Sequence, residues 1–165
     1  MRKIFSIIFS LAIAISFAAP TFAITDEQKS AISGNCSSTQ QSLRTLQRSD
    51  SRTRVYLGSI YQTVLADYIT PLNLRLVKNN RPSATLTSIQ ADFTSARDDS
   101  AQKFIIYSQA LEELILIDCK SRPEDFYNKL QDVRKKRSEL SASSTKISNI
   151  LNSHIEEVNK LKESL

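Results

Sequence analysis

The sequence predicts an all-α protein, an elongated antiparallel three-helix bundle with coiled-coil-like seams and one disulfide. Only two glycines and four prolines occur in 165 residues, so the chain lacks the turn residues that many short strands or a phosphate-binding glycine loop require. Apolar residues recur in alternating steps of four and three, which is the spacing of a helix packed along a seam. Three prolines, at positions 71, 82 and 123, divide this pattern into helices.

The first 23 residues have the layout of a cleaved signal peptide. Residues 1–3 supply positive charge, residues 4–19 carry none, and small residues precede a cleavage site after Ala23. The apolar run is shorter than the about 20 residues of a spanning helix, so we expect no stable membrane span after cleavage, with an uncleaved anchor as the alternative. We expect an exported protein, whether periplasmic, at the cell surface or secreted, with one helical-bundle domain at residues 24–165.

The last helix, at about residues 122–164, has the most regular pattern. Ser121 stands three residues before Glu124, as in a capping box, and Pro123 falls in the first turn. Five full heptads follow without a helix breaker. The seam positions are Phe126, Leu130, Val133, Arg137, Leu140, Ser144, Ile147, Leu151, His154, Val158, Leu161 and Leu165.

The first helix is expected at about residues 25–70, and a short helical tip at 71–80 follows it. Thr25 and Gln28 form a capping box at its start. The seam phase continues to Val64, which favours one long helix, although a break near Asp50 is the alternative. Within the tip, Asn79-Asn80 can end the short helix through left-handed conformations. Its apolar residues are expected to plug the end of the bundle, namely Leu72, Leu74, Leu76 and Val77.

The middle helix is expected at about residues 83–120, between two prolines. Its seam positions are Leu86, Ile89, Phe93, Ala96, Ser100, Phe104, Tyr107, Leu111, Leu114 and Asp118. None of the three helices is apolar all round, so each must bury one stripe against the other two.

The two cysteines are expected to form a structural disulfide. Cys36 lies 35 residues before Pro71, and Cys119 lies 37 residues after Pro82, so the two fall within about one turn of each other in an up-and-down bundle. An exported protein meets an oxidising compartment, in which such a pair closes. A redox-active pair is the alternative, but the Cys-x-x-Cys spacing is absent.

The same counting of heights pairs two polar residues of the first helix with two of the last. Asp50 and Arg137 are expected in one layer, and Asp67 and His154 in another. Buried pairs of this kind fix the register of helices more than they add stability. A proton-dependent or ligand-binding site around His154 is the alternative interpretation.

The sequence offers no catalytic, cofactor or metal site, and we expect no enzyme activity. His154 is the only imidazole that could act as a base, and no serine has a glycine-framed elbow around it. The adjacent carboxylate pairs point about 100° apart on a helix, as solvated side chains do. These pairs are Asp98-Asp99, Glu112-Glu113 and Glu156-Glu157.

Two basic surfaces are candidates for binding. A basic belt could form where the first and last helices reach similar heights, from Arg44, Arg48, Arg52, Arg134, Lys135 and Lys136. The tip would display Arg75, Lys78, Asn79, Asn80 and Arg81. The belt could hold a polyanion or an acidic protein surface, and the tip is a loop on a rigid scaffold. The alternatives are a solvated face and a connector that caps the core.

Two short segments resemble the Leu-Thr-x-x-Gln motif of small helical periplasmic chaperones. They are Ile24-Thr25-Asp26-Glu27-Gln28 and Leu86-Thr87-Ser88-Ile89-Gln90. These ten residues carry the whole resemblance, and the first segment departs from the motif at Ile24. The resemblance implies a chaperone as one function to be tested and identifies no family.

The function expected from these observations is an exported, non-enzymatic binding or structural module. It would present its tip or a helical face to a protein partner. The alternatives are a holdase-type chaperone outside the cytoplasm and a polyanion-binding protein that uses the arginine faces. Because residues 1–23 carry two basic and no acidic side chains, their removal lowers the formal net charge from +5 to +3. We expect no nucleic-acid binding at so small an excess. The seams could also support a homodimer.

Overall fold

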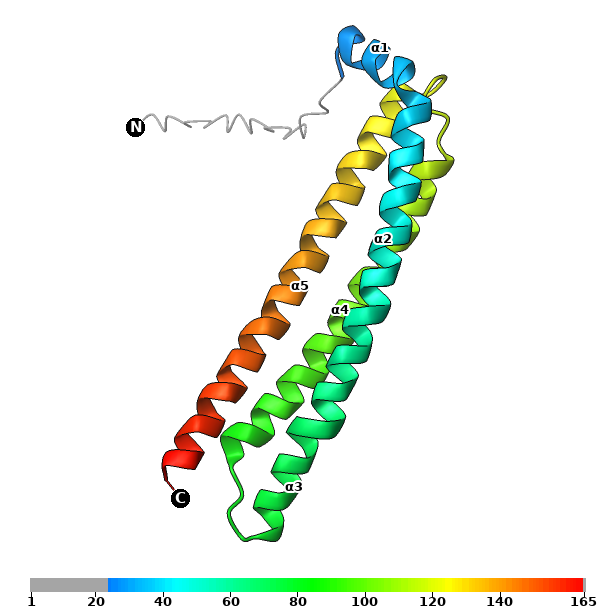
Figure 1. The fold of residues 1–165 in the computed structure, drawn as a ribbon. Coiled ribbons are helices and arrows are strands. Elements are labelled where there is room, and N and C mark those ends of the chain that lie inside the picture. The colour runs from blue at the N-terminus through cyan, green and yellow to red at the C-terminus, as the bar shows by residue number, and fades with distance from the viewer. Residues whose placement is uncertain (1–23, 165) are drawn as a thin grey trace, which may run out of the picture.

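The computed structural model describes residues 24–164, so the expected signal peptide lies outside the described residues. Every regular element in this range is helical, which confirms the all-α prediction. Figure 1 shows α2, α4 and α5 running side by side along one long axis, with α1 across one end and α3 at the other. The elements are α1 (Asp26–Gly34), α2 (Cys36–Thr63), the π-helical segment η1 (Val64–Ile69), α3 (Thr70–Lys78), α4 (Ala84–Leu116) and α5 (Pro123–Glu163). None of the helices described is long and apolar enough to span a membrane.

The expected uninterrupted helix from residue 25 is wrong at its beginning, where the chain bends between α1 and α2. The capping box is present, since the Gln28 N–H donates to Thr25 Oγ1 at 3.2 Å and the Thr25 N–H donates to Gln28 Oε1 at 2.9 Å. Asn35 then leaves the helix with φ −100° and ψ 12°. Glycine and asparagine are poor helix formers, so Gly34-Asn35 is the weakest point of the pattern. The alternative break near Asp50 does not occur, because α2 is continuous there.

The same expected helix does not stop before Pro71. Pro71 lacks the N–H that would bond to the residue four positions earlier, and its ring crowds that carbonyl. The chain accommodates this by widening into η1, in which the Thr70 N–H reaches the Leu65 carbonyl, and it then continues into α3. A local π-helical turn is a known way to keep a helix running past such a position. Residues 36–78 are therefore one helical run, and the short tip helix is its last part.

The middle helix ends four residues earlier than expected, at Leu116. Ile117 is extended, and the Asp118 carboxylate accepts the Lys120 N–H at 3.0 Å and the Ser121 hydroxyl at 2.7 Å. A side chain that bonds to its own backbone in this way competes with the helix. The hydrogen bond from Ser121, followed by that from Lys120, lowers the pKa of Asp118. The expected capping role of Ser121 is wrong, since its hydroxyl turns to Asp118 and Arg122 occupies the cap position without a side-chain bond.

The core is divided into two apolar clusters, with α4 packed along α5 through both. The larger one surrounds the disulfide and holds Cys36, Leu43, Tyr107, Ala110, Leu111, Leu114, Ile115, Cys119, Phe126 and Val133. The smaller one lies toward the tip and holds Ile69, Phe93, Ala96 and Ile147. Tyr61 of α2 meets Phe93 edge-on in the smaller cluster, with ring centroids 6.1 Å apart. The helix α2 is thus anchored in both clusters.

The tip differs from the expected plug. Asn80 adopts φ 56°, which confirms that α3 ends through a left-handed asparagine. However, the side chains of Leu74 and Val77 are 65% and 60% exposed. The extension of the helix past Pro71 explains this, because it carries α3 to the end of the molecule, where η1 and α4 are its main neighbours among the described elements. Plugging of the end by Leu74 and Val77 is therefore wrong.

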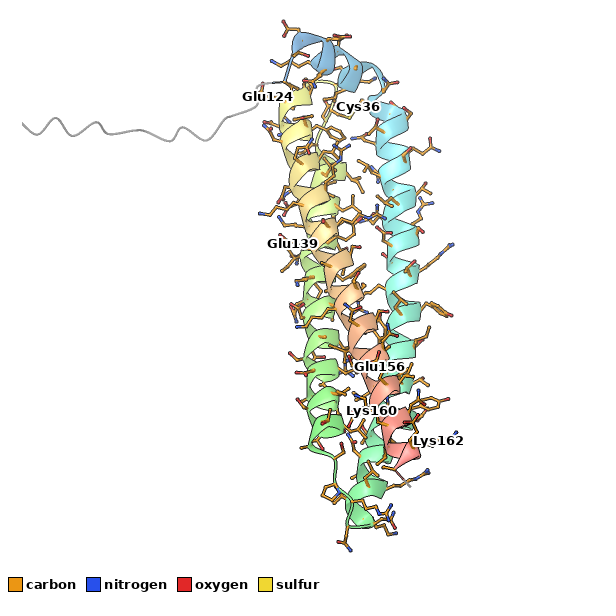
Figure 2. The ribbon with its side chains drawn as sticks, turned by 90° about the vertical axis from the view of Figure 1, so that its left-hand side faces the viewer. Cys36, Glu124, Glu139, Glu156, Lys160 and Lys162 are labelled. Carbon is orange, nitrogen blue, oxygen red and sulfur yellow. A yellow bond between two sulfur atoms is a disulfide. The ribbon has the colours of Figure 1, made fainter. Side chains whose placement is uncertain are left out.

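The predicted disulfide is present and joins Cys36 to Cys119, with the two Cα atoms 5.5 Å apart. Figure 2 labels Cys36 and Glu124 at the end of the molecule that α1 covers. Hydrogen bonds reinforce the link, because Gln40 Nε2 donates to the Ile115 and Ile117 carbonyls at 3.2 and 3.0 Å. Both cysteines are buried, at 4% and 0% exposure. The disulfide therefore holds the start of α2 against the turn that follows α4.

Removing the disulfide should destabilise the protein substantially. We expect a Cys36→Ser/Cys119→Ser variant to lose about 2–5 kcal/mol of unfolding free energy, because the unfolded chain is released from a long closed loop. Urea unfolding followed by circular dichroism measures this loss. The wild-type protein with dithiothreitol should fall to the same midpoint as the variant. A variant as stable as the oxidised wild type would contradict the prediction.

Candidate functional site

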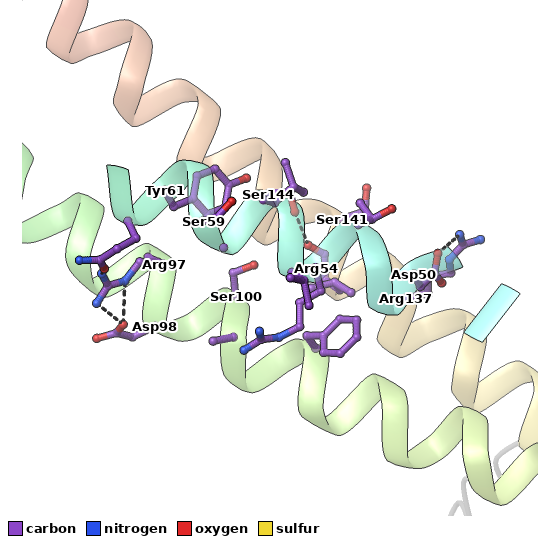
Figure 3. Close-up of a pocket in the computed structure, with 18 of the residues that line it drawn as sticks. Asp50, Arg54, Ser59, Tyr61, Arg97, Asp98, Ser100, Arg137, Ser141 and Ser144 are labelled. Atoms are coloured by element: carbon purple, nitrogen blue, oxygen red, sulfur yellow. Dashed lines mark hydrogen bonds and ion pairs between the residues drawn. The ribbon is translucent and has the colours of Figure 1, made fainter. Parts of the chain in front are cut away.

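A cleft of about 990 Å³ separates α2 from the α4–α5 pair between the two apolar clusters. It lies where seam positions that elsewhere hold leucine or phenylalanine are occupied by Ser100 and Ser144, with Gly58 on the facing helix. Side chains this small cannot fill the space between helices, so the core stops here and resumes beyond. Figure 3 shows Ser100, Ser141 and Ser144 between a polar group at either end of the cleft. The cleft opens to solvent past Val55, which is 68% exposed.

At the end nearer the disulfide, one carboxylate of α2 binds side chains of both α4 and α5. Tyr107 of α4 donates its hydroxyl to Asp50 Oδ2 of α2 at 2.6 Å, and Arg137 of α5 donates from Nη2 to Asp50 Oδ1 at 3.3 Å. Tyr107 is 1% exposed. Burial, followed by the hydrogen bond to the carboxylate, raises the pKa of Tyr107 well above its ordinary value near 10. The phenol therefore stays protonated and acts as a hydrogen-bond donor.

At the other end of the cleft, an arginine connects α4 to α2. Arg97 donates from Nη1 to Gln62 Oε1 at 2.9 Å, and its Nη2 lies 3.0 Å from Asp98 Oδ1. Figure 3 places Arg97 and Asp98 at the end of the cleft opposite Asp50 and Arg137. Asp50 and Gln62 are twelve residues apart on α2, so the two polar links stand about 18 Å apart along the helix. They join α2 to α4 and α5 at the two ends of the cleft.

The surface between these links combines apolar side chains with cations. Leu57, Phe104 and Leu140 line the cleft from the three helices. Arg54 stacks its guanidinium over the Phe104 ring, 5.4 Å from its centroid, in a cation–π contact. Arg134 also lines the cleft, and no ion pair of Arg134 or Arg54 occurs among the described residues. With four arginines against two aspartates in its lining, the cleft carries a formal charge of +2.

The second predicted polar pair does not form. Asp67 is exposed, and no hydrogen bond or ion pair joins it to His154. The Nε2 atom of His154 is instead buried without a partner in the described structure. Burial lowers the pKa of His154, because desolvation disfavours the charged imidazolium. The expected pairing is wrong, because Asp67 lies within η1, whose wider turn directs its side chain differently from an uninterrupted α-helix.

The candidate belt and tip residues occupy separate surfaces. Arg44, Arg48 and Arg52 are exposed on α2 and do not line the cleft, whereas Arg134 does. Lys135 is exposed, and Lys136 forms an ion pair with Asp132. The structure does not join the two halves of the belt through an ion pair or through the cleft, so polyanion binding stays a prediction. The candidate tip residues are all exposed at the end of α3, namely Arg75, Lys78, Asn79, Asn80 and Arg81.

The pairing of Asp50 with Arg137 follows from residue spacing, but the cleft that these two residues bound was not predicted from the sequence. The signal was present in the seam itself, because Ser100 and Ser144 interrupt two apolar stripes at similar heights. The pattern marks Tyr107 only as a seam residue and gives no reason to single out Arg97. Nothing in the sequence indicates that the guanidinium of Arg97 reaches Gln62, since that contact depends on the distance between two helices.

Comparison of this chain with protein-family models, with curated protein sequences and with solved structures finds no match. The chaperone resemblance of its two short segments therefore has no support from these comparisons. In the structure, Thr25 and Gln28 form a helix cap. The second segment lies inside α4, where Thr87 donates its hydroxyl to the Ser83 carbonyl at 2.9 Å. The function has to be argued from the cleft and from the exposed surfaces.

The Tyr107 hydrogen bond should contribute measurably to stability. Tyr107→Phe keeps the ring and removes the hydroxyl, so we expect a loss of about 1.5–3 kcal/mol in unfolding free energy, the range for bonds to charged groups. Urea unfolding of the two proteins measures the difference. Tyr56→Phe is the matched control, since Tyr56 is 65% exposed, and it should change stability by less than about 0.5 kcal/mol. Equal effects of the two substitutions would show that the Asp50 contact is not stabilising.

The unfolding free energy should fall as the pH drops below the ordinary pKa of histidine, about 6.5. The folded state binds the His154 proton less tightly than the unfolded chain, whose imidazole titrates at about pH 6.5. The unfolded chain therefore takes up protons first, so stability is complete above about pH 6.5 and declines as the pH falls toward the lower folded-state pKa. Urea midpoints between pH 7 and pH 5 measure the slope. His154→Leu should flatten it, and an unchanged slope in that variant would contradict the assignment.

Proposed function

We propose that this protein is an exported, non-enzymatic binding module that receives a segment of a protein partner in the cleft between α2 and the α4–α5 pair. The helical runs 36–78, 84–116 and 123–163 would act together as one elongated antiparallel three-helix bundle. One observation supports the proposal: the core is interrupted by a cleft that is lined by apolar and cationic side chains and has a polar contact at each end. Larger apolar side chains at the positions of Ser100 and Ser144 would increase stability, because an unfilled space in the core loses packing energy. A chain selected only for stability would therefore fill the cleft.

The chemistry of the cleft favours a partner segment over a reaction. A catalytic serine would need a base beside it, and His154, the only histidine of the chain, does not line the cleft. The cleft has apolar side chains between cations, so it suits a partner segment that carries both apolar and acidic residues. Burial of the apolar side chains would give affinity, and the charged groups would orient the segment. The cationic rim at Arg54 and Arg134 would meet the acidic groups.

Site-specific cross-linking in the native host tests the proposal. Ser141→benzoylphenylalanine places a photoreactive group in the cleft, and Ala142→benzoylphenylalanine places the same group on the exposed neighbouring position outside it. One stoichiometric partner captured from position 141 and not from position 142 would support a dedicated binding module. A broad, substoichiometric set of exported proteins would instead favour the holdase alternative. Equal capture from both positions would overturn the proposal.

Filling the cleft should separate binding from stability. We expect Ser100→Leu/Ser144→Leu to join the two apolar clusters and to raise the unfolding free energy by about 0.5–2 kcal/mol, as cavity-filling substitutions commonly do. The same variant should lose cross-linking of the partner from position 141. Ala142→Leu, which adds the same side chain outside the cleft, is the control, and it should retain capture. A filled variant that is more stable and still captures the partner would place the binding surface elsewhere.

A polyanion is the second candidate ligand, and one observation favours it. Arg44, Arg48 and Arg52 recur every four residues on an exposed face, and no ion pair of theirs occurs among the described residues. A surface of this kind attracts a flexible anionic chain without shape complementarity. Its signature would be retention on heparin that weakens steeply with salt.

A further inference from the structure

The tip of the molecule, formed by α3 and the turn that follows it, is bonded to α4 along one face of α3. The rest of α3 is not covered by the described elements. Asn73 Nδ2 donates to the Leu86 carbonyl at 3.2 Å and to Gln90 Oε1 at 2.6 Å. Gln90 in turn donates from Nε2 to Thr70 Oγ1 at 3.1 Å. These bonds fix one face of α3 against the start of α4. Figure 1 shows α3 at the end of the molecule opposite α1, where it leads into the turn before α4.

Three large apolar side chains are exposed on this end. Tyr68 of η1 and Leu74 of α3 are each 65% exposed, and Val77 is 60% exposed. Leu74 and Val77 are three residues apart, so they lie on the same side of the helix, one turn from each other. Two adjacent exposed aliphatic side chains at an extremity are accessible to an apolar partner surface.

Between residues 68 and 91, all the charged side chains at this end are basic. Arg75, Lys78 and Arg81 are exposed, and none of them forms an ion pair among the described residues. No aspartate or glutamate occurs between residues 68 and 91. Lysine and arginine carry long apolar stems, so their charged groups can reach past neighbouring leucine and valine side chains. The tip therefore presents two exposed aliphatic side chains beside three exposed cations.

We propose that this tip docks on an anionic lipid surface. Leu74 and Val77 enter the boundary between headgroups and acyl chains, and Arg75, Lys78 and Arg81 contact lipid phosphates. An amphipathic segment with cations around an apolar face binds membranes by adding buried apolar area to electrostatic attraction. A soluble polyanion would use the cations but leave Leu74 and Val77 in water, so the combination favours lipid. This site is separate from the cleft, which stays free to hold a partner.

Vesicle binding tests the proposal on the purified protein with its disulfide formed. The probes are vesicles of equal parts phosphatidylcholine and phosphatidylglycerol, and vesicles of phosphatidylcholine alone. We expect co-sedimentation with the anionic vesicles and little with the neutral ones. Because the chain contains no tryptophan, Leu74→Trp introduces a single reporter whose emission should shift to shorter wavelength when anionic vesicles are added. No binding to anionic vesicles would overturn the proposal.

Two pairs of variants distinguish vesicle binding through the tip from non-specific electrostatic attraction between the protein and anionic vesicles. Arg75→Gln/Lys78→Gln/Arg81→Gln should weaken binding roughly 100-fold, at about fivefold for each cation near an anionic surface. Arg44→Gln/Arg48→Gln/Arg52→Gln removes the same charge from α2 and should weaken binding by less than about fivefold. Leu74→Ser/Val77→Ser should weaken binding at least about tenfold, while Leu116→Ser/Ile155→Ser, at two other exposed positions, should not.

Each outcome decides the question. Equal loss in the two charge variants would show that net charge, and not the tip, drives attraction, and it would overturn the proposal. Full binding by Leu74→Ser/Val77→Ser would overturn insertion, as would retention on heparin without binding to anionic vesicles. Circular dichroism of every variant checks that the helices are intact. Selective loss in both tip variants, with both controls weakened by less than about fivefold, would establish the site.

Discussion

The disulfide between Cys36 and Cys119 is the constraint on which the rest of the arrangement depends. It holds the first turn of α2 against the turn between α4 and α5. Because each helical residue advances the chain by about 1.5 Å, this point sets the heights of the residues that follow. Asp50 lies 14 residues after Cys36, and Arg137 lies 14 residues after Pro123, and the two meet at 3.3 Å. Tyr107 comes to the same carboxylate from the third helix.

That register also produces the cleft. The small residues Ser100, Ser144 and Gly58 lie in the same layer and line the cleft. The two apolar clusters contact α2 on either side of this layer, and the space between the clusters stays open. The polar links at Asp50 and Arg97 stand at its two ends and join α2 to the other helices there. Polar links between packed helices specify an arrangement more than they stabilise it. The proposed partner site therefore depends on the same contacts that set the register.

The sequence predicted much of the fold because its strongest signals are local. Helical periodicity, the Thr25 cap and the left-handed Asn80 depend on residues within a few positions of one another, and all are present. The errors fall where two local signals compete. Pro71 predicted a helix end, but the helix continues past it through η1. Asp118 ended α4 early because its carboxylate took the Lys120 N–H. The Asp67–His154 pair did not form, because Asp67 lies within η1.

By itself, the sequence determined the helical class, the disulfide and one polar pair, since these follow from residue spacing and constant helical rise. Only the tertiary structure decided how far α2 stands from the α4–α5 pair, that Arg97 reaches Gln62, and that Leu74 and Val77 remain in solvent. The physical reason is that periodicity reports which side of a helix is apolar. It does not report the distance between helices, which depends on how all the facing side chains pack together.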